Sequence, residues 1–136
     1  MYTEKIVMAI LNDLPVWQKL NVSAFLASSV SIGISATHGQ AFVTRNGTHY
    51  LPFIKHPVVV LGAESKDQLQ RALKRARDRG LAIGIYTGAL FHTRSEEGNL
   101  EEIRQSDDES LDLVGLIVYG ENKKVDKAME GLKFHV

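Results

Sequence analysis

PVVVLGAESKDQLQRALKRARDRGLAIGIY, residues 57–86, decides the fold because it predicts a strand, a capped amphipathic helix and a second strand. The β-branched run 57–62 is typical of a strand buried on both faces. Ser65 and Gln68 fit a capping box, and apolar residues then recur at helical spacing. Gly80 follows where a helix favours a left-handed residue, before the apolar run 81–86. We expect the two strands to run parallel, joined by a right-handed crossover.

Further elements are predicted towards both ends of the chain. Residues 5–12 form an apolar and therefore central strand, and Pro15 opens a helix that ends near residues 31–33. Residues 111–120 form the last central strand, and Asn122 is expected to cap a closing helix. The tail 133–136 is expected to pair as an edge or to pack on the sheet. In the first helix we expect small residues to allow close approach to the sheet: Ser23, Ala24, Ala27 and Ser28.

Two segments lie outside this regular pattern. Asn46-Gly47 between the β-prone runs 41–44 and 48–51 predicts a hairpin, which we interpret as a small β-ribbon off the main sheet. Residues 95–109 are polar and acidic, with one helix expected around 100–104. The whole chain, 1–136, is then a single α/β domain. It is a three-layer sandwich whose mostly parallel or mixed sheet of about four strands carries helices on both faces.

Composition excludes several classes of protein. The 136 residues include no cysteine, which removes disulfides, thiolate nucleophiles and cysteine-based metal sites, and which favours a cytoplasmic location. No apolar run approaches the ~20 residues of a membrane helix, so we expect no membrane partner. The 16 basic and 16 acidic residues balance, which argues against broad binding to nucleic acid.

The charge is unevenly distributed along the chain. Residues 66–79 are mainly basic, and residues 96–112 are mainly acidic. The two segments either face each other, face solvent or serve different partners. If the basic helix contacts phosphates, the chain is an RNA-associated module, and tRNA is one RNA that it could bind.

Motifs for common cofactors and nucleophiles are missing. The chain has no nucleophile elbow, no dinucleotide-binding glycine pattern and no phosphate-binding loop, so we expect no cofactor. The histidines are scattered without metal-ligand spacing, so we expect no metal site. His92 is the best functional candidate among them, followed by His38.

In an open α/β sheet, ligands bind beyond the carboxyl ends of the strands. Those ends are predicted at residues 12–13, 62–64, 86–88 and 119–121. We expect a small polar pocket there, with Trp17 as a wall and the following polar side chains converging on it: Asn12, Asp13, Asn21, Thr87, His92 and Thr93. The alternative is that Asp13 caps the first helix, Trp17 fills the core and Thr87 makes a turn.

The segments 58–86, 5–29 and 113–132 resemble, in the same order, the type 2 peptidyl-tRNA hydrolases. The details DLPVWQKLNV at 13–22, Tyr119-Gly120 and KVDK at 124–127 are more similar to an uncharacterised bacterial branch, domain of unknown function 2000. The resemblance implies the hydrolase fold and a homodimer, since the resembling family often dimerises. An apolar first helix and the ribbon offer an edge for such pairing.

The resemblance does not extend to the hydrolase catalytic pattern Lys-x-Ala-Ala-Gln-x-x-His. Its lysine, glutamine and histidine positions fall on Asn21, Phe25 and Ser28, and its acidic residue falls near Thr87. An amide or an alcohol does not replace an ammonium or a carboxylate in proton transfer. A slip of one or two residues instead places Lys19 in the lysine role.

Three functions fit these residues. The first is a non-catalytic domain that binds a small polar ligand at the strand ends. The second is an ester or amide hydrolase in which Asp13 or His92 is the general base and Lys19 or a helix N-terminus stabilises the oxyanion. The third is the RNA-associated module.

Overall fold

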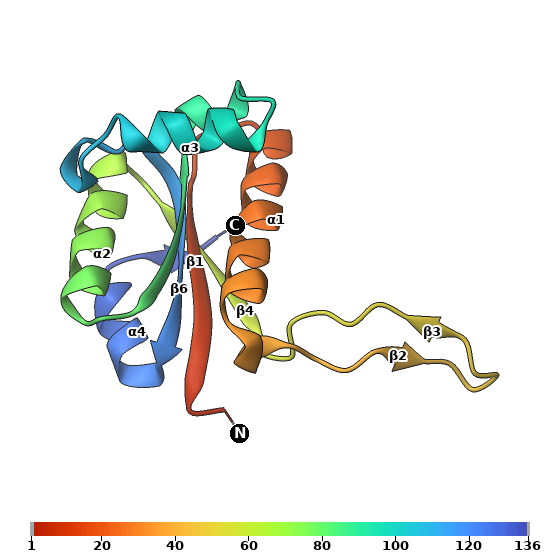
Figure 1. The fold of residues 1–136 in the computed structure, drawn as a ribbon. Coiled ribbons are helices and arrows are strands. Elements are labelled where there is room, and N and C mark those ends of the chain that lie inside the picture. Colours follow the sequence, from red (N-terminus) through yellow and green to blue (C-terminus); the bar gives the residue numbers. More distant parts are fainter. Residues whose placement is uncertain (1, 136) are drawn as a thin grey trace.

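A five-stranded mixed sheet forms the centre of the computed structural model, which describes residues 2–135 (Figure 1). Its strand order is β5-β6-β1-β4-β7. β1 runs parallel to β4 and antiparallel to β6, while β5 is antiparallel to β6 and β7 to β4. The strands span Glu4–Leu11 (β1), Val58–Ala63 (β4), Ala82–Thr87 (β5), Leu113–Glu121 (β6) and Lys133–Phe134 (β7).

The predicted α/β sandwich is confirmed, and the four apolar runs lie in one sheet. β4 and β5 point the same way, as predicted, but β1 and β6 lie between them. The reason is burial: β1 and β6 are buried on both faces over most of their length. The centre of a sheet is where such strands belong.

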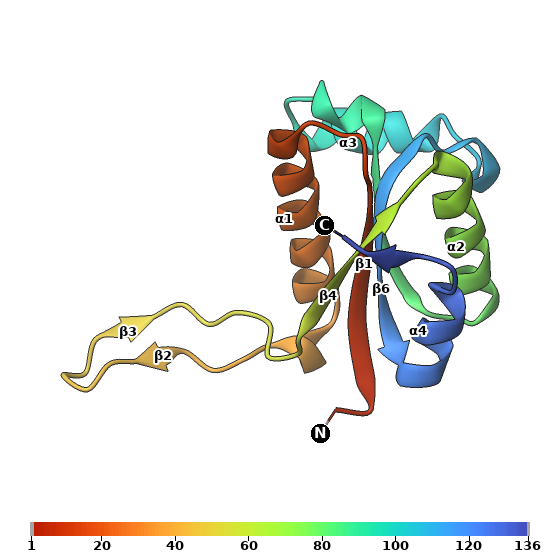
Figure 2. The ribbon, with the colours of Figure 1, turned by 180° about the vertical axis from the view of Figure 1, so that it is seen from behind.

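Helices cover both faces of the sheet (Figures 1 and 2). α1 (Val16–Gly33) lies on one face, and α2 (Lys66–Asp78) and α4 (Asn122–Ala128) lie on the other. α3 (Glu96–Arg104) crosses the end of the sheet where β1 and β5 finish. α2 carries the predicted cap, because the Gln68 N–H donates to Ser65 Oγ over 3.2 Å. Gly80 follows it with a φ of 66°, as predicted.

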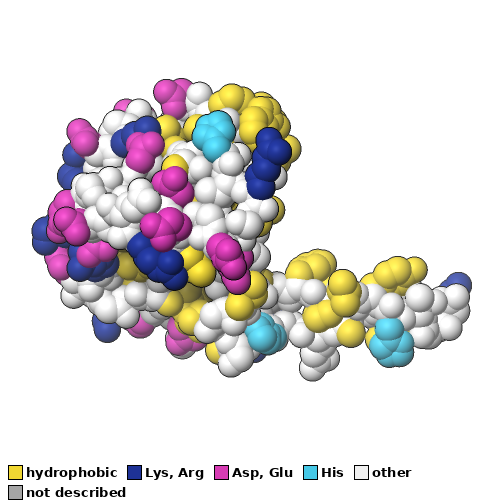
Figure 3. Space-filling view, turned by 45° about the horizontal axis from the view of Figure 1, so that its top comes forward, with side chains coloured by type: hydrophobic (Ala, Val, Ile, Leu, Met, Phe, Trp, Pro, Cys, Tyr) yellow, Lys and Arg dark blue, Asp and Glu magenta, His cyan; other side chains and the backbone are white. Residues whose placement is uncertain are grey.

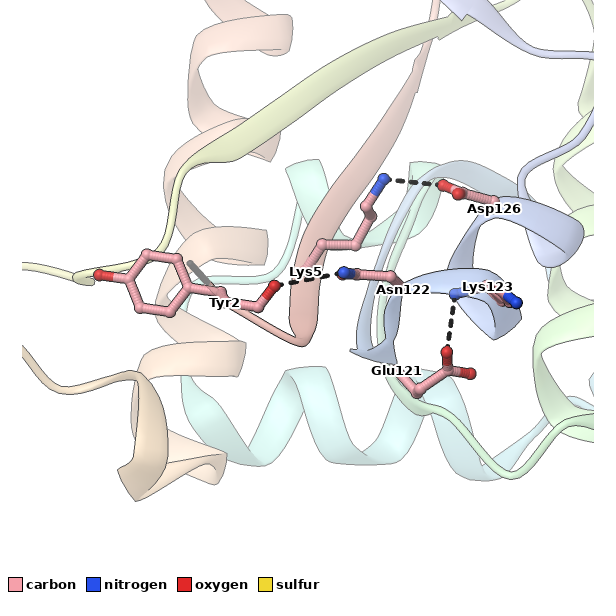
Figure 4. Close-up of polar contacts among 6 residues, drawn as sticks. All are labelled: Tyr2, Lys5, Glu121, Asn122, Lys123 and Asp126. Atoms are coloured by element: carbon pink, nitrogen blue, oxygen red, sulfur yellow. Dashed lines mark hydrogen bonds and ion pairs between the residues drawn. The ribbon is translucent and has the colours of Figure 1, made fainter.

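Two predicted helix caps are wrong. No side chain caps α1, which begins after Pro15, so Asp13 has no capping role. α4 is capped by Glu121, whose carboxylate accepts a 3.2 Å hydrogen bond from the Lys123 N–H (Figure 4). Asn122 is the first helical residue instead, and its side-chain amide donates to the Tyr2 carbonyl over 3.2 Å.

The same close-up shows the end of β6 joined to the start of β1. Lys5 Nζ lies 2.8 Å from Asp126 Oδ1, which ties β1 to α4 (Figure 4). Because β6 is antiparallel to β1, residues 119–121 lie beside residues 4–6. This corrects the prediction that 119–121 shares an edge with the ends of β1, β4 and β5.

The predicted hairpin is confirmed as a projecting ribbon. β2 (Phe42–Val43) pairs with β3 (His49–Tyr50) around a turn in which Gly47 has a φ of 90°. We call residues 38–55 the arm. It is joined at its root by a bridge between His38 and Ile54, and it extends sideways from the body at the C-terminal end of α1 (Figures 1 and 2).

α1 approaches the sheet closely because the sheet offers glycines beneath it. A Cβ on Gly115 would lie 2.7 Å from Val22 Cγ1, and one on Gly84 would collide with Ser29 Oγ. Val22, Leu26 and Val30 are the buried residues of α1. Ala24 and Ser28 face solvent, so the small residues that allow the contact belong mainly to the sheet.

Gly115→Ala is expected to lower the free energy of unfolding by about 1–3 kcal/mol, because the added methyl overpacks the α1–sheet contact. Gly33→Ala is the control: nothing lies within 4 Å of its Cβ position, and helical alanine is favoured over glycine. Urea unfolding measures both. Equal midpoints for the two variants would contradict the close contact.

Candidate functional site

An open cavity of about 400 Å³ lies where α1, the end of β5 and the segment 90–99 meet. Hydrophobic side chains gather at this end of the molecule, at the upper right of Figure 3. The cavity lies on the carboxyl side of β5, as expected for a sheet of this type. Its lining residues are Trp17, Asn21, Phe25, Ile85, Tyr86, Leu90, Phe91, Thr93, Arg94, Ser95 and Asn99.

Four aromatic rings form a continuous wall of this cavity. Ring centroids are 5.9 Å apart for Trp17 and Phe91, 5.0 Å for Phe91 and Tyr86, and 5.9 Å for Tyr86 and Phe25. Trp17 is 57% exposed and Phe25 is 58% exposed. The alternative in which Trp17 fills the core is therefore wrong, because its ring stands at the cavity rather than inside the sandwich.

Some polar side chains of the cavity form hydrogen bonds within the protein and others do not. Thr93 Oγ1 lies within hydrogen-bonding distance of the Leu90 carbonyl and Asn99 Oδ1. Ser95 Oγ accepts from the Gly98 N–H over 3.0 Å and so caps α3. Asn21 and Arg94 make no side-chain hydrogen bond or ion pair with any residue in 2–135. These two groups are available to a ligand.

Tyr86 contributes both a ring and a hydroxyl. Burial raises the pKa of this phenol above its ordinary value of 10.0. It is therefore neutral at physiological pH, and its hydroxyl can donate or accept a hydrogen bond.

Three of the predicted site residues line the cavity: Trp17, Asn21 and Thr93. The predicted meeting of Asp13 with Asn21 does not occur there, because Asp13 lies in the exposed turn before α1 and is not part of the lining. Thr87 is buried, next in the chain to Tyr86 and paired with Leu113.

The remaining predicted residues lie elsewhere. Lys19 on α1 and His92 after the 3₁₀ turn Gly88–Phe91 do not line the cavity. Asn12 lines a separate depression beside Gly62 and Lys133. On a helix, positions 17, 21 and 25 share one face while position 19 points about 200° away from 17, which explains the exclusion of Lys19.

Sequence reasoning missed most of the cavity lining, including Phe25, Tyr86, Phe91, Arg94 and Asn99. One signal for Phe25 was present, since it continues the i, i+4 series begun by Trp17 and Asn21. The others come from three different elements and a loop: Tyr86 from β5, Phe91 from the 3₁₀ turn, Arg94 from the loop after it and Asn99 from α3. Tertiary packing brings them together.

The basic helix α2 faces the acidic segment, as the first of the three alternatives predicted from the sequence requires. Lys66 Nζ lies 2.5 Å from Asp112 Oδ1, and an Arg77 nitrogen lies 2.9 Å from Asp108 Oδ2. Arg75 donates to the carbonyls of Ala128 and Glu130. These partners reduce the positive potential that a phosphate backbone would meet.

Within residues 2–135, no group of three or more His, Cys, Asp or Glu side chains is placed to hold a metal ion. In the same part of the chain, none of the helices combines the length and apolar character needed to cross a bilayer.

The raised pKa of Tyr86 gives a pH prediction. The folded state keeps the phenolic proton to higher pH than the unfolded state, so this group's stabilising contribution is lost as the pH rises above about 10. Urea unfolding at pH 9 and pH 11 should show a smaller loss of stability for Tyr86→Phe than for the unmodified protein. An identical loss in both would contradict the burial of this hydroxyl.

The comparisons with known proteins concern fold and family. No curated protein matches the chain. A solved structure, the protein of unknown function Atu0240 from Agrobacterium tumefaciens strain C58, is 29% identical and superposes with a TM-score of 0.94 over 100% of both chains. The profile of one family matches residues 4–136. The chain therefore belongs to the family described as Protein of unknown function (DUF2000).

Proposed function

We propose that this chain is a binding domain whose cavity takes a small planar ring compound that carries a carboxylate. The observation that carries this proposal is the four-ring wall beside two unpaired polar groups, Asn21 and Arg94. Aromatic pairs contribute about 0.5–1.5 kcal/mol beyond area burial when a ring stacks on them. A volume of about 400 Å³ is within the range of small-molecule sites.

The preference for an anion depends on Arg94. It directly precedes Ser95, the N-cap of α3, where the helix dipole favours negative charge. Glu96 and Glu97 occupy the first turn of α3 and oppose that effect. The guanidinium is therefore the main attraction for a carboxylate, which it can bind through two parallel hydrogen bonds.

Neutral groups complete the recognition. The Asn21 amide supplies both a donor and an acceptor, and the neutral Tyr86 phenol supplies one of each. Together they suit a ligand with a further hydroxyl, amine or carbonyl on the ring. Each such neutral hydrogen bond contributes roughly 0.5–1.5 kcal/mol.

Calorimetry with benzoate and benzamide tests the proposal. Benzoate is expected to bind more tightly, and Arg94→Gln is expected to weaken benzoate about tenfold or more while leaving benzamide unchanged, because a charged hydrogen bond contributes about 1.5–3 kcal/mol. Trp17, the single tryptophan of the chain, reports the same binding by fluorescence.

Arg71→Gln is the matched control, since Arg71 is an exposed arginine of α2 away from this cavity. It should leave both affinities unchanged. Equal weakening by Arg71→Gln and Arg94→Gln would show a general charge effect and contradict the site.

We further propose that the fold is related to the type 2 peptidyl-tRNA hydrolases without sharing their reaction. The order of the elements supports the kinship. The absence of a shared reaction is supported by Asn21 and Phe25, which stand where that pattern has lysine and glutamine, and by the position of Lys19 outside the cavity.

Purified protein is accordingly expected to release no peptide from peptidyl-tRNA above the uncatalysed rate, because the described residues that line the cavity include no ammonium and no carboxylate. The assay follows released tRNA on a gel. Turnover that disappears in Lys19→Ala or Asp13→Asn would instead establish the hydrolase alternative.

A further inference from the structure

α1 carries large apolar side chains on its exposed side as well as on its buried side. Lys19 is its only charged residue, although one face already packs on the sheet. The opposite face is exposed and mainly apolar, and we call it the outer face: Trp17, Leu20, Ala24, Phe25, Ser28 and Ile32. A surface helix ordinarily presents polar residues to solvent on this side. In the single chain the large apolar side chains of the outer face stay in contact with water.

The arm also exposes large apolar side chains. Residues 40–53 are all exposed, and large apolar side chains are concentrated among them: Phe42, Val43, Tyr50, Leu51 and Phe53. Its two strands pair over two residues each, and an isolated hairpin of this size is marginal in water. Figure 3 shows hydrophobic side chains spread along the arm, which stands clear of the body.

We propose that the outer face of α1 and the arm form one interface of a homodimer, in which the arm of each copy embraces the body of the other. The two surfaces contain no acidic residue and only three basic ones, Lys19, Arg45 and Lys55, if the whole helix is counted. The partner that fits these two surfaces therefore has an apolar surface of its own. A second copy of the chain has one.

Dimensions agree with this arrangement. Each limb of the arm, about eight residues from root to tip, reaches roughly 26 Å if it is fully extended, and the 18 residues of α1 extend roughly 27 Å. One arm can thus extend along a length equal to the partner's helix. The arm and outer face together involve on the order of 25 residues, the number that a stable interface uses on each side.

The shape favours a protein over a flat lipid surface. The arm leaves the body sideways at the end of α1, so the helix and the arm enclose a corner (Figures 1 and 2). A corner receives a convex body, whereas a bilayer contacts only one of its sides. A two-fold axis satisfies both corners at once and closes the assembly, which leaves no apolar arm exposed.

The same interface borders the candidate cavity, because Trp17 and Phe25 belong both to the outer face and to the cavity lining. The inference about a second copy does not depend on any ligand, since it rests on Ile32, Leu20 and the arm, which lie outside that lining.

Sedimentation velocity at several concentrations tests the dimer. The unmodified chain is expected to sediment at twice its monomer mass at micromolar concentration. Ile32→Glu on α1 and Leu51→Glu on the arm should each raise the dissociation constant at least tenfold. These side chains are 85% and 86% exposed, so the substitutions leave the fold intact, which circular dichroism verifies.

Phe134→Glu is the control, because Phe134 is a similarly exposed apolar residue, at 77%, on the far edge strand β7. It should remain dimeric. A monomer at all concentrations, or equal weakening by all three variants, would overturn the proposal. Binding to lipid vesicles by a chain that is monomeric in solution would also overturn it.

Contact between the arm and a second body is tested directly because the chain lacks cysteine. Asn46→Cys at the arm tip carries a donor dye in one sample, and Ser28→Cys on the outer face carries an acceptor in another. Energy transfer is expected on mixing and should disappear when Leu51→Glu is added to the donor chain. Persistent transfer in that variant would exclude the arm from the interface.

Discussion

The burial of β1 on both faces and along both edges is the constraint on which the rest of the structure depends. Residues 6–11 are almost inaccessible to solvent, with β4 paired on one side and β6 on the other. Because β4 is parallel to β1 and β6 is antiparallel, the ends of β1, β4 and β5 meet at one edge and the end of β6 at the other. The cavity lies at the first edge, and the contacts of Lys5 and Asn122 lie at the second.

The elements of this fold could be predicted from local patterns, whereas their arrangement could not. β-branched runs mark the strands, and Ser65 with Gln68 marks the start of α2. The order of β5 and β6 in the sheet depends on which strands bury most apolar surface, and this is a property of the whole chain. β6 also runs antiparallel to β1, so placing residues 119–121 at the ligand edge was wrong.

The candidate site was predictable in part. Trp17 and Asn21 lie one turn apart on α1 and both reach the cavity, as Thr93 does from the segment after β5, and Phe25 continues the helical series. Phe91 and Arg94 come from the segment after β5, where no period applies. Asp13 and His92 do follow strand ends along the chain, as predicted. Nearness along the chain, however, does not direct a side chain into a cavity.

α1 takes part in both the proposed ligand site and the proposed dimer interface, because its buried face packs on the sheet and its outer face is free for binding. On the sheet side, Val22 and Leu26 pack against Gly115 and Ser29 packs against Gly84, which leaves no room there for a ligand. Recognition is therefore confined to the outer face and its border with β5. A ligand at that border and a second copy on the outer face would share Trp17 and Phe25, so each would reduce the apolar surface that the other must bury. Occupancy of the cavity and association of two chains are then thermodynamically coupled, and the coupling is reciprocal.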